Sequence, residues 1–464
     1  MTGRPKVLVI GLDCAEPSLV FDRYINVLPN LKRLISTGVY ARMRSSDPPI
    51  TVPAWAVMMT GKDPGQLGFY GFRNRNSFDY DDIHIVDSSS LKEPCVWDIL
   101  GKHGYQSIVM GVPPSYPPKP IQGHLISCFL TPEKPETYTY PASLAREIEE
   151  HVGEYQFDVK NFRTSGRETL LEQIYQMTET RFNTARYLMK NKPWDFMIMV
   201  EMGVDRIHHA FWQYMDDRHV LYQESPYQNA ILDYYRFVDQ KIGEILDVAP
   251  AETRIFVVSD HGAKRMDGGF CINEWLIREG YLTLRHPVDK PTDLSADIVD
   301  WKKTIAWGYG GYYGRLCLNV KGREPQGVIS PGKVPSVRKE IIQKLKNLTD
   351  EKGNPLHTKV IRPDKRYLAT KNIPPDLLIY FGDLYWRSVG KIGLGKVYIY
   401  ENDTGPDGAN HDYEGIFITA RNREETDSGG KQLETIRIVD LAPTLLAQFG
   451  IQPPKGMQGK MVPL

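Results

Sequence analysis

The sequence predicts an α/β protein with a three-layer α/β/α core, a mostly parallel central sheet and an inserted lid subdomain. Short runs rich in valine and isoleucine, at residues 7–12, 107–110, 196–200 and 254–259, alternate with helical patterns. Such apolar strands are typical of a parallel sheet covered by helices on both faces. The alternation is lost after residue 262 and resumes near residue 415, which indicates that a separate segment interrupts the core.

Helical patterns fill the intervals between these strands. Residues 29–37 and 53–60 each begin with a proline, which suits the first turn of a helix, and the second stretch ends at Gly61. Longer helices are expected at residues 169–191 and 227–246. Helices of this number and length are enough to cover both faces of the sheet.

The middle of the chain has a different composition. From about residue 263 to residue 404, glycine, proline, tyrosine and tryptophan become frequent. We therefore expect one core made of residues 1–262 and 405–464, with residues 263–404 inserted as a lid that selects the substrate. After the insertion we expect a strand at residues 415–419 and a closing helix at residues 437–449.

Composition narrows the class of protein. The 57 basic and 57 acidic side chains cancel, which argues against a nucleic-acid surface as the main partner. No run approaches the roughly 18 apolar residues of a transmembrane helix, so no membrane segment is expected. The five cysteines are widely spaced and form no CxxC pair, which argues against a disulfide framework and predicts a reducing, cytoplasmic location. Nothing in the sequence indicates an oligomeric state.

Two residues in the N-terminal part of the chain have side chains that could bind a metal ion or act as a nucleophile. Asp13 directly follows the first strand, and Thr51 stands at the start of a predicted helix. Taken singly, both would be ordinary caps. A threonine at a helix N-terminus could also act as a nucleophile, because the helix end and a nearby metal ion both favour the alkoxide.

Two later strand ends carry an aspartate with a histidine. Asp205 and His209 are four residues apart, so one helical turn would place both on one face, where they could share an ion. Asp260 and His261 are adjacent and directly follow another strand. Both could reach an ion if the backbone turns, which Gly262 permits.

A late histidine completes the set. His411 follows the insertion, in Asn410-His411-Asp412. Each histidine alone would more often be a surface or core residue than a ligand. The order of the whole set indicates the function: a strand-end Asp, a helix-start Thr, Asp-x3-His, Asp-His and a late His.

This order resembles the alkaline phosphatase superfamily, and more closely its type I phosphodiesterase and nucleotide pyrophosphatase branch. The interval from Asp13 to Thr51 is 38 residues (51 − 13), and Pro53 follows the threonine. Thr60-Gly61-Lys62-Asp63-Pro64 is similar to the family's Thr-Gly-x2-Pro segment. The resemblance covers the core, roughly residues 1–262 and 405–464.

The resemblance implies two divalent ions, one bound by Asp205, His209 and His411, and the other by Asp13, Thr51, Asp260 and His261. Nitrogen and oxygen ligands without thiolate suit Zn²⁺, with Mn²⁺ as the second choice. It also implies that Thr51 attacks a small-molecule phosphate ester or diester and that water then hydrolyses the phospho-threonine. A phosphomonoesterase, a phosphoryl or headgroup transferase on the same site, and a metal-stabilised binding protein without turnover remain alternatives.

Two departures from the family pattern concern the substrate. Leu67-Gly68 stands where family members usually have His-Gly, and Asn74 is near, but out of step with, the asparagine that lines the phosphoryl pocket. Within the insertion, flat side chains could stack on the leaving group, and two cations could contact a second anionic group. These candidates are Tyr309, Tyr312, Tyr313, Arg315 and Lys321.

Overall fold

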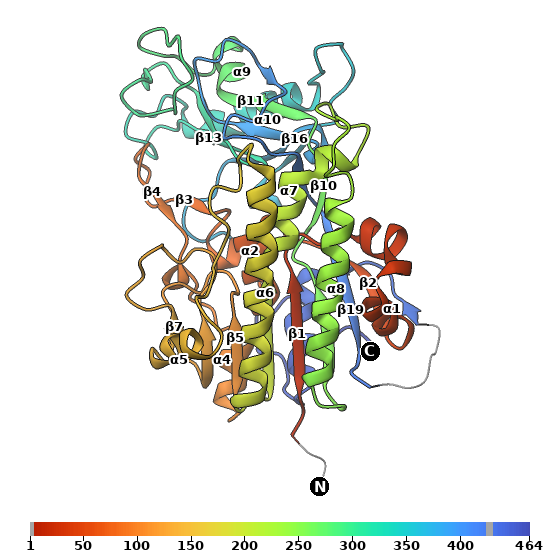
Figure 1. The fold of residues 1–464 in the computed structure, drawn as a ribbon. Helices are drawn as coiled ribbons and strands as arrows, with labels where there is room; N and C mark the ends of the chain where they lie inside the picture. Colours follow the sequence, from red (N-terminus) through yellow and green to blue (C-terminus); the bar gives the residue numbers. More distant parts are fainter. Residues whose placement is uncertain (1–3, 424–429) are drawn as a thin grey trace.

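A large twisted sheet forms the centre of the protein (Figure 1). The computed structural model describes residues 4–423 and 430–464. Five neighbouring strands are parallel, in the order β9-β1-β8-β5-β6. They are β9 (Arg254–Val258), β1 (Val7–Leu12), β8 (Phe196–Glu201), β5 (Ser107–Met110) and β6 (Gly123–Ile126).

The sheet is extended by antiparallel strands at both sides. The strand predicted at residues 415–419 is β19 (Glu414–Arg421), which pairs antiparallel with β9 and with β2 (Val39–Arg44). At the other side, β7 (Thr139–Tyr140) pairs antiparallel with β6. Short strands β20 (Lys431–Gln432) and β21 (Ile436–Arg437) pair with β2. The sheet is therefore mixed but mostly parallel at its centre.

Helices pack on both faces of the sheet, as the apolar strands predict. The helices α6 (Arg167–Asn191), α7 (Gly203–Met215) and α8 (Ala230–Val248) pack on one another in front of the sheet, and α1 (Pro29–Ser36) joins them beside α8 (Figure 1). Behind the sheet, three other helices contact one another: α2 (Thr51–Thr60), α4 (Val96–Lys102) and α12 (Leu441–Ala447). No helix in the described part of the chain is long and apolar enough to span a bilayer.

The closing helix is shorter than predicted. It begins at Leu441, because residues 438–440 form a 3₁₀ turn in which the Asp440 carboxylate accepts hydrogen bonds from the backbone N–H and the guanidinium of Arg437. A helical pattern does not distinguish such a turn from the α-helix that follows it. Gly450, with a φ of 69°, lies just beyond the helix, as predicted.

The segment after β9 folds around a second hydrophobic cluster at one end of the sheet (Figure 1). It contains an antiparallel sheet of β12 (Ala306–Tyr309), β13 (Gly314–Leu318), β15 (Leu377–Tyr380) and β14 (Lys359–Ile361). A second sheet consists of β16 (Trp386–Val389), β11 (Gly268–Cys271) and β17 (Tyr398–Ile399), and the helices are α9 (Ile272–Arg278) and α10 (Val334–Lys346). The boundaries at residues 263 and 404 stay a prediction.

A hairpin from the N-terminal part of the chain joins this second cluster. It consists of β3 (Arg73–Arg75) and β4 (Ile83–Ile85). In the loop between the two strands, Tyr80 stacks on Trp301 with ring centroids 3.6 Å apart. Arg75, at the end of β3, pairs with the buried Glu324 at 3.0 Å. The structure that covers this end of the sheet, called the cap below, therefore consists of the hairpin of residues 73–85 together with the insertion.

Candidate metal centre and active site

One cluster of ligand-type side chains forms where two neighbouring parallel strands end. Asp13 directly follows β1, and Asp260 with His261 follows β9, which pairs with β1. His261 Nε2 lies 3.2 Å from Asp260 Oδ2 and 3.8 Å from Asp13 Oδ1. We call Asp13, Asp260 and His261 cluster 2, and all three are fully buried.

The other group of ligand-type side chains comes from helix α7 and from a strand that follows the insertion in the sequence. Asp205 and His209 lie one turn apart on α7, with His209 Nε2 3.2 Å from Asp205 Oδ1. His411 lies on β18 (Ala409–Asp412), which pairs antiparallel with β10 (Gly262–Arg265), and its Nε2 lies 3.7 Å from Asp205 Oδ1. We call Asp205, His209 and His411 cluster 1.

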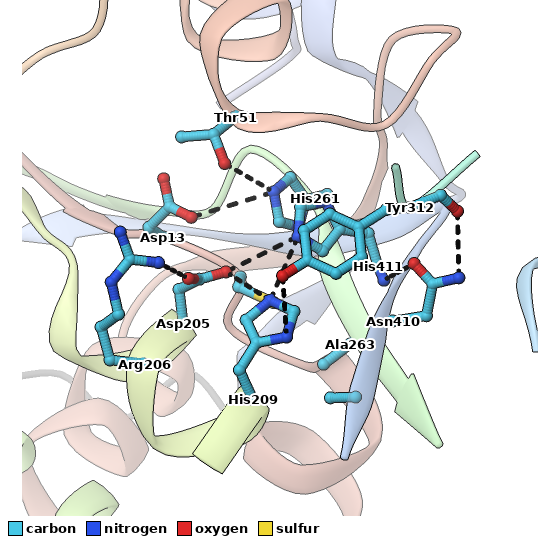
Figure 2. A network of polar contacts seen from close by, with 12 residues as sticks. Asp13, Thr51, Asp205, Arg206, His209, His261, Ala263, Tyr312, Asn410 and His411 are labelled. Carbon is cyan, nitrogen blue, oxygen red and sulfur yellow. Dashed lines mark hydrogen bonds and ion pairs between the residues drawn. The ribbon is translucent and has the colours of Figure 1, made fainter. Parts of the chain in front are cut away.

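The two clusters are adjacent. The rings of His261 and His411 stack with centroids 3.8 Å apart (Figure 2). Within each cluster the ligand atoms lie within 4.8 Å of one another. The structure therefore brings together all six of the aspartates and histidines predicted as ligands, and it divides them into the two predicted sets.

The carboxylates of both clusters suit cations. Asp13 Oδ1, Asp205 Oδ1 and Asp260 Oδ2 are buried without a hydrogen-bond donor among the described residues, and each faces a histidine of its own cluster. Burial and neighbouring carboxylates raise the pKa of Asp13 and Asp260 well above the usual range. Asp13 and Asp260 are therefore most stable as anions when a cation lies between them. At Asp205, burial is outweighed by the charges of His209 and Arg206, which hold the pKa of that carboxyl well below its usual range.

The histidines are mostly held as neutral rings. Burial lowers the pKa of His261 to about 4, and burial with the nearby His261 lowers the pKa of His411 well below its usual value. Burial would also lower the pKa of His209, but the carboxylates of Asp407 and Asp205 raise it to about 9. Neutral imidazole is the form that binds a metal, so His209 must lose a proton when an ion binds.

Thr51 lies at the edge of cluster 2. It is the first residue of α2, Ile50 occupies the cap position, and the Thr51 Oγ1 lies 3.3 Å from His261 Nε2 (Figure 2). Thr51 also lines a cavity of about 730 Å³ together with Asp205 and His411. Its hydroxyl is therefore in a position to react with a substrate bound in that cavity.

Gly262 is needed because it has no side chain, and not because its backbone adopts an unusual conformation. It begins β10, and its φ is not in the left-handed region. A Cβ there would lie 2.2 Å from the Glu414 carbonyl oxygen and 2.5 Å from Glu16 Oε2. The expected turn at Gly262 is thus corrected to a close approach of β10 to its neighbours. His208 lies outside both clusters and packs against Trp212 and Tyr235.

Several residues that the sequence analysis did not predict surround cluster 1. Asp407 Oδ1 lies 2.8 Å from His209 Nδ1, and Asp407 also pairs with Arg163 at 3.0 Å. Arg206, next to Asp205, pairs with Asp158. Histidine ligands are commonly oriented by a carboxylate on the second nitrogen, but Asp407 is 198 residues from His209, so no local pattern in the sequence links the two.

The predicted substrate residues are placed unequally. Tyr309, Tyr312 and Tyr313 line the cavity, as does Arg315. Tyr312 stacks on His209 and His411, and Tyr313 donates its hydroxyl to the Tyr70 carbonyl. Two candidates lie away from the described cavity lining. Lys321 is exposed, and the Asn74 amide bonds to the backbone of residues 70 and 71.

The mostly parallel α/β fold and its two buried Asp/His clusters are consistent with a phosphoric ester hydrolase of the alkaline phosphatase superfamily, and a family comparison shows that membership. The family model described as type I phosphodiesterase / nucleotide pyrophosphatase matches residues 7–413, and the chain belongs to this family. The match includes all six cluster residues and Thr51. No curated protein matches the chain.

Proposed function

We propose that the protein hydrolyses phosphate diesters through a phospho-threonine intermediate on Thr51, with one divalent ion in each cluster. The observation that carries the proposal is the position of Thr51 Oγ1, 3.3 Å from His261 Nε2 and on the wall of the cavity that cluster 1 also lines. The family supports a diester or pyrophosphate substrate. The ligand set supports Zn²⁺ over Mn²⁺.

The residues divide the work between binding and reaction. Bound ions would supply Lewis acidity to the phosphoryl oxygens and favour the alkoxide of the nucleophile. Thr51 Oγ attacks phosphorus and its hydroxyl proton passes to solvent, while the bond from phosphorus to the leaving oxygen breaks and that oxygen is protonated. Water then cleaves the phospho-threonine, which releases phosphate ester and restores the Thr51 hydroxyl.

A threonine exchange tests the proposal. Thr51→Ala is expected to lower turnover of an aryl phosphate diester by at least about a hundredfold, because the nucleophile is lost. Two bound ions should remain, since Thr51 supplies only one of several ligands. Thr60→Ala is the matched control, because Thr60 ends the same buried helix and donates its hydroxyl to the Ala56 carbonyl. Near-normal turnover in Thr51→Ala would move the nucleophile elsewhere, to Ser46 or, if Thr60→Ala itself loses turnover, to Thr60.

A further inference from the structure

Arg206 is a buried cation on the wall of the active-site cavity. It directly follows Asp205 on α7, only 7% of its surface is exposed, and it lines the cavity with Thr51. Figure 2 shows its guanidinium against the Asp205 carboxylate, on the opposite side from His209. Arg206 therefore lies beside cluster 1 without belonging to it.

The guanidinium is fixed before any ligand arrives. Its Nε and Nη2 donate to the two carboxylate oxygens of Asp158 at 2.8 Å and 2.6 Å, and its Nη1 donates to Asp205 Oδ2. The Phe162 ring lies 4.6 Å from the guanidinium carbon, and Phe129 lies on the cavity wall nearby. A bidentate carboxylate and an aromatic face together hold the plane of an arginine.

Two hydrogen-bond donors of this side chain are left over. A guanidinium carries five N–H groups, and the three hydrogen bonds to Asp158 and Asp205 use three of them. No other described residue accepts a hydrogen bond from Arg206. A buried arginine with two unused donors on a cavity wall is suited to an anionic oxygen.

Two other side chains considered for contact with the phosphoryl group have their donors engaged within the protein. The amide of Asn74 is used by the backbone of residues 70 and 71. Arg163, a further cation on the cavity wall, pairs with Asp407 and donates to the Tyr312 hydroxyl. Arg206 thus combines two unused donors with a direct contact to Asp205, a residue of cluster 1.

We propose that Arg206 is a catalytic residue that donates its two free N–H groups to a nonbridging oxygen of the transferred phosphoryl group. The inference rests on the proposed function for the identity of that group. Asp158 is then a positioning residue, which holds the guanidinium plane. A charged donor gains more from a dianion than from a monoanion, so inorganic phosphate is a sensitive probe of this contact.

Binding of inorganic phosphate to the ion-loaded protein tests the inference without turnover. Arg206→Met is expected to keep two ions per chain and to raise the Kd of phosphate, measured by calorimetry, at least about tenfold, the value of a charge-assisted hydrogen bond. Added guanidinium ion should restore part of the binding. Asp158→Asn should raise the Kd less, because the charge stays. Arg73→Met is the control, since Arg73 is an exposed cation on the same cavity wall.

A merely structural role gives a different result. If Arg206 only orients Asp205, Arg206→Met loses the ion of cluster 1, and guanidinium restores nothing, which overturns the inference. Unchanged phosphate affinity with both ions bound also overturns it. Arg206→Lys provides a second variant if the methionine protein does not fold, and it should weaken phosphate binding because the planar fork is lost. An inactive wild-type protein whose phosphate affinity depends on Arg206 would contradict the proposed function and leave this inference standing.

Discussion

The two clusters differ in the carboxylate that supports each of them. Behind cluster 1, Asp407 contacts His209 and Arg163, and although burial opposes ionisation, these charges hold the pKa of Asp407 below its usual range. Behind cluster 2, Glu16 accepts hydrogen bonds from the backbone N–H of Ala263 and of Ser18. Burial and the charge of Asp412 raise the pKa of Glu16 to about 7.

The difference teaches that one site is organised by charge and the other by burial. Cluster 1 lies in a network of ion pairs that continues to Tyr312 and the cavity wall. Cluster 2 lies at the end of apolar strands, with Trp55 Nε1 donating to Asp13 at 2.7 Å and the Cys14 backbone N–H donating to Asp260 at 3.2 Å. Removing a charged side chain should therefore weaken metal binding in cluster 1. A change in the protonation of Glu16 should instead change the stability of the region behind cluster 2.

The largest expected effect concerns Glu16 and pH. A carboxyl whose pKa is raised in the folded state stabilises the protein fully below the unfolded value near 4.5, and this contribution is lost as pH rises to about 7. The difference is on the order of 3 kcal/mol. Glu16→Gln removes it, so urea unfolding of the metal-free proteins should show a flatter pH dependence for the variant. Parallel pH profiles of wild type and variant would show that Glu16 titrates normally.

The next effect separates the two ions. Asp407→Asn should weaken the ion of cluster 1 by about 10- to 100-fold, because His209 loses the carboxylate that orients it, while the ion of cluster 2 keeps its affinity. Competition with a chelator measures both affinities. Asp267→Asn is the control, since Asp267 forms a half-buried pair with Arg265 of β10, the strand that pairs with β18. Equal weakening of both ions would mean that the clusters are not independently supported.

The smallest effect tests the outer part of the charge network. The Tyr312 hydroxyl donates to Asp407 at 3.1 Å. Tyr312→Phe should weaken the cluster 1 ion about fivefold, the value of one hydrogen bond of about 1 kcal/mol, since the ring still stacks on the two histidines. In Tyr313→Phe the lost hydroxyl is the one that donates to the Tyr70 carbonyl, away from Asp407, so metal affinity should not change. A larger loss in Tyr313→Phe than in Tyr312→Phe would contradict the network.

Cluster 2 could be predicted more fully from the sequence than the surroundings of cluster 1. Asp13 and Asp260 follow apolar strands, and the carboxyl ends of parallel strands meet at one edge of a sheet, so local patterns place them together, while their assignment to one ion came from the family resemblance. The Asp205 and His209 pair follows from helical spacing. Asp407 and Asp158 could not be found in this way, because they contact His209 and Arg206 across 198 and 48 residues of chain.

The structure of the cap could also be predicted only in part from the sequence. Its frequent glycines and aromatic residues indicate a segment distinct from the core, but the pattern does not show that the loop around Tyr80 packs into it against Trp301. That contact depends on which surfaces of the hairpin and the insertion are complementary, and neither surface has a periodic signal of its own.

The stereochemical course of hydrolysis tests the central proposal most directly. Two successive in-line displacements, first by Thr51 and then by water, each invert the configuration at phosphorus. Hydrolysis of a chiral phosphorothioate diester in isotopically labelled water should therefore proceed with net retention. Net inversion would show that water attacks the substrate directly, and it would contradict Thr51 as the nucleophile.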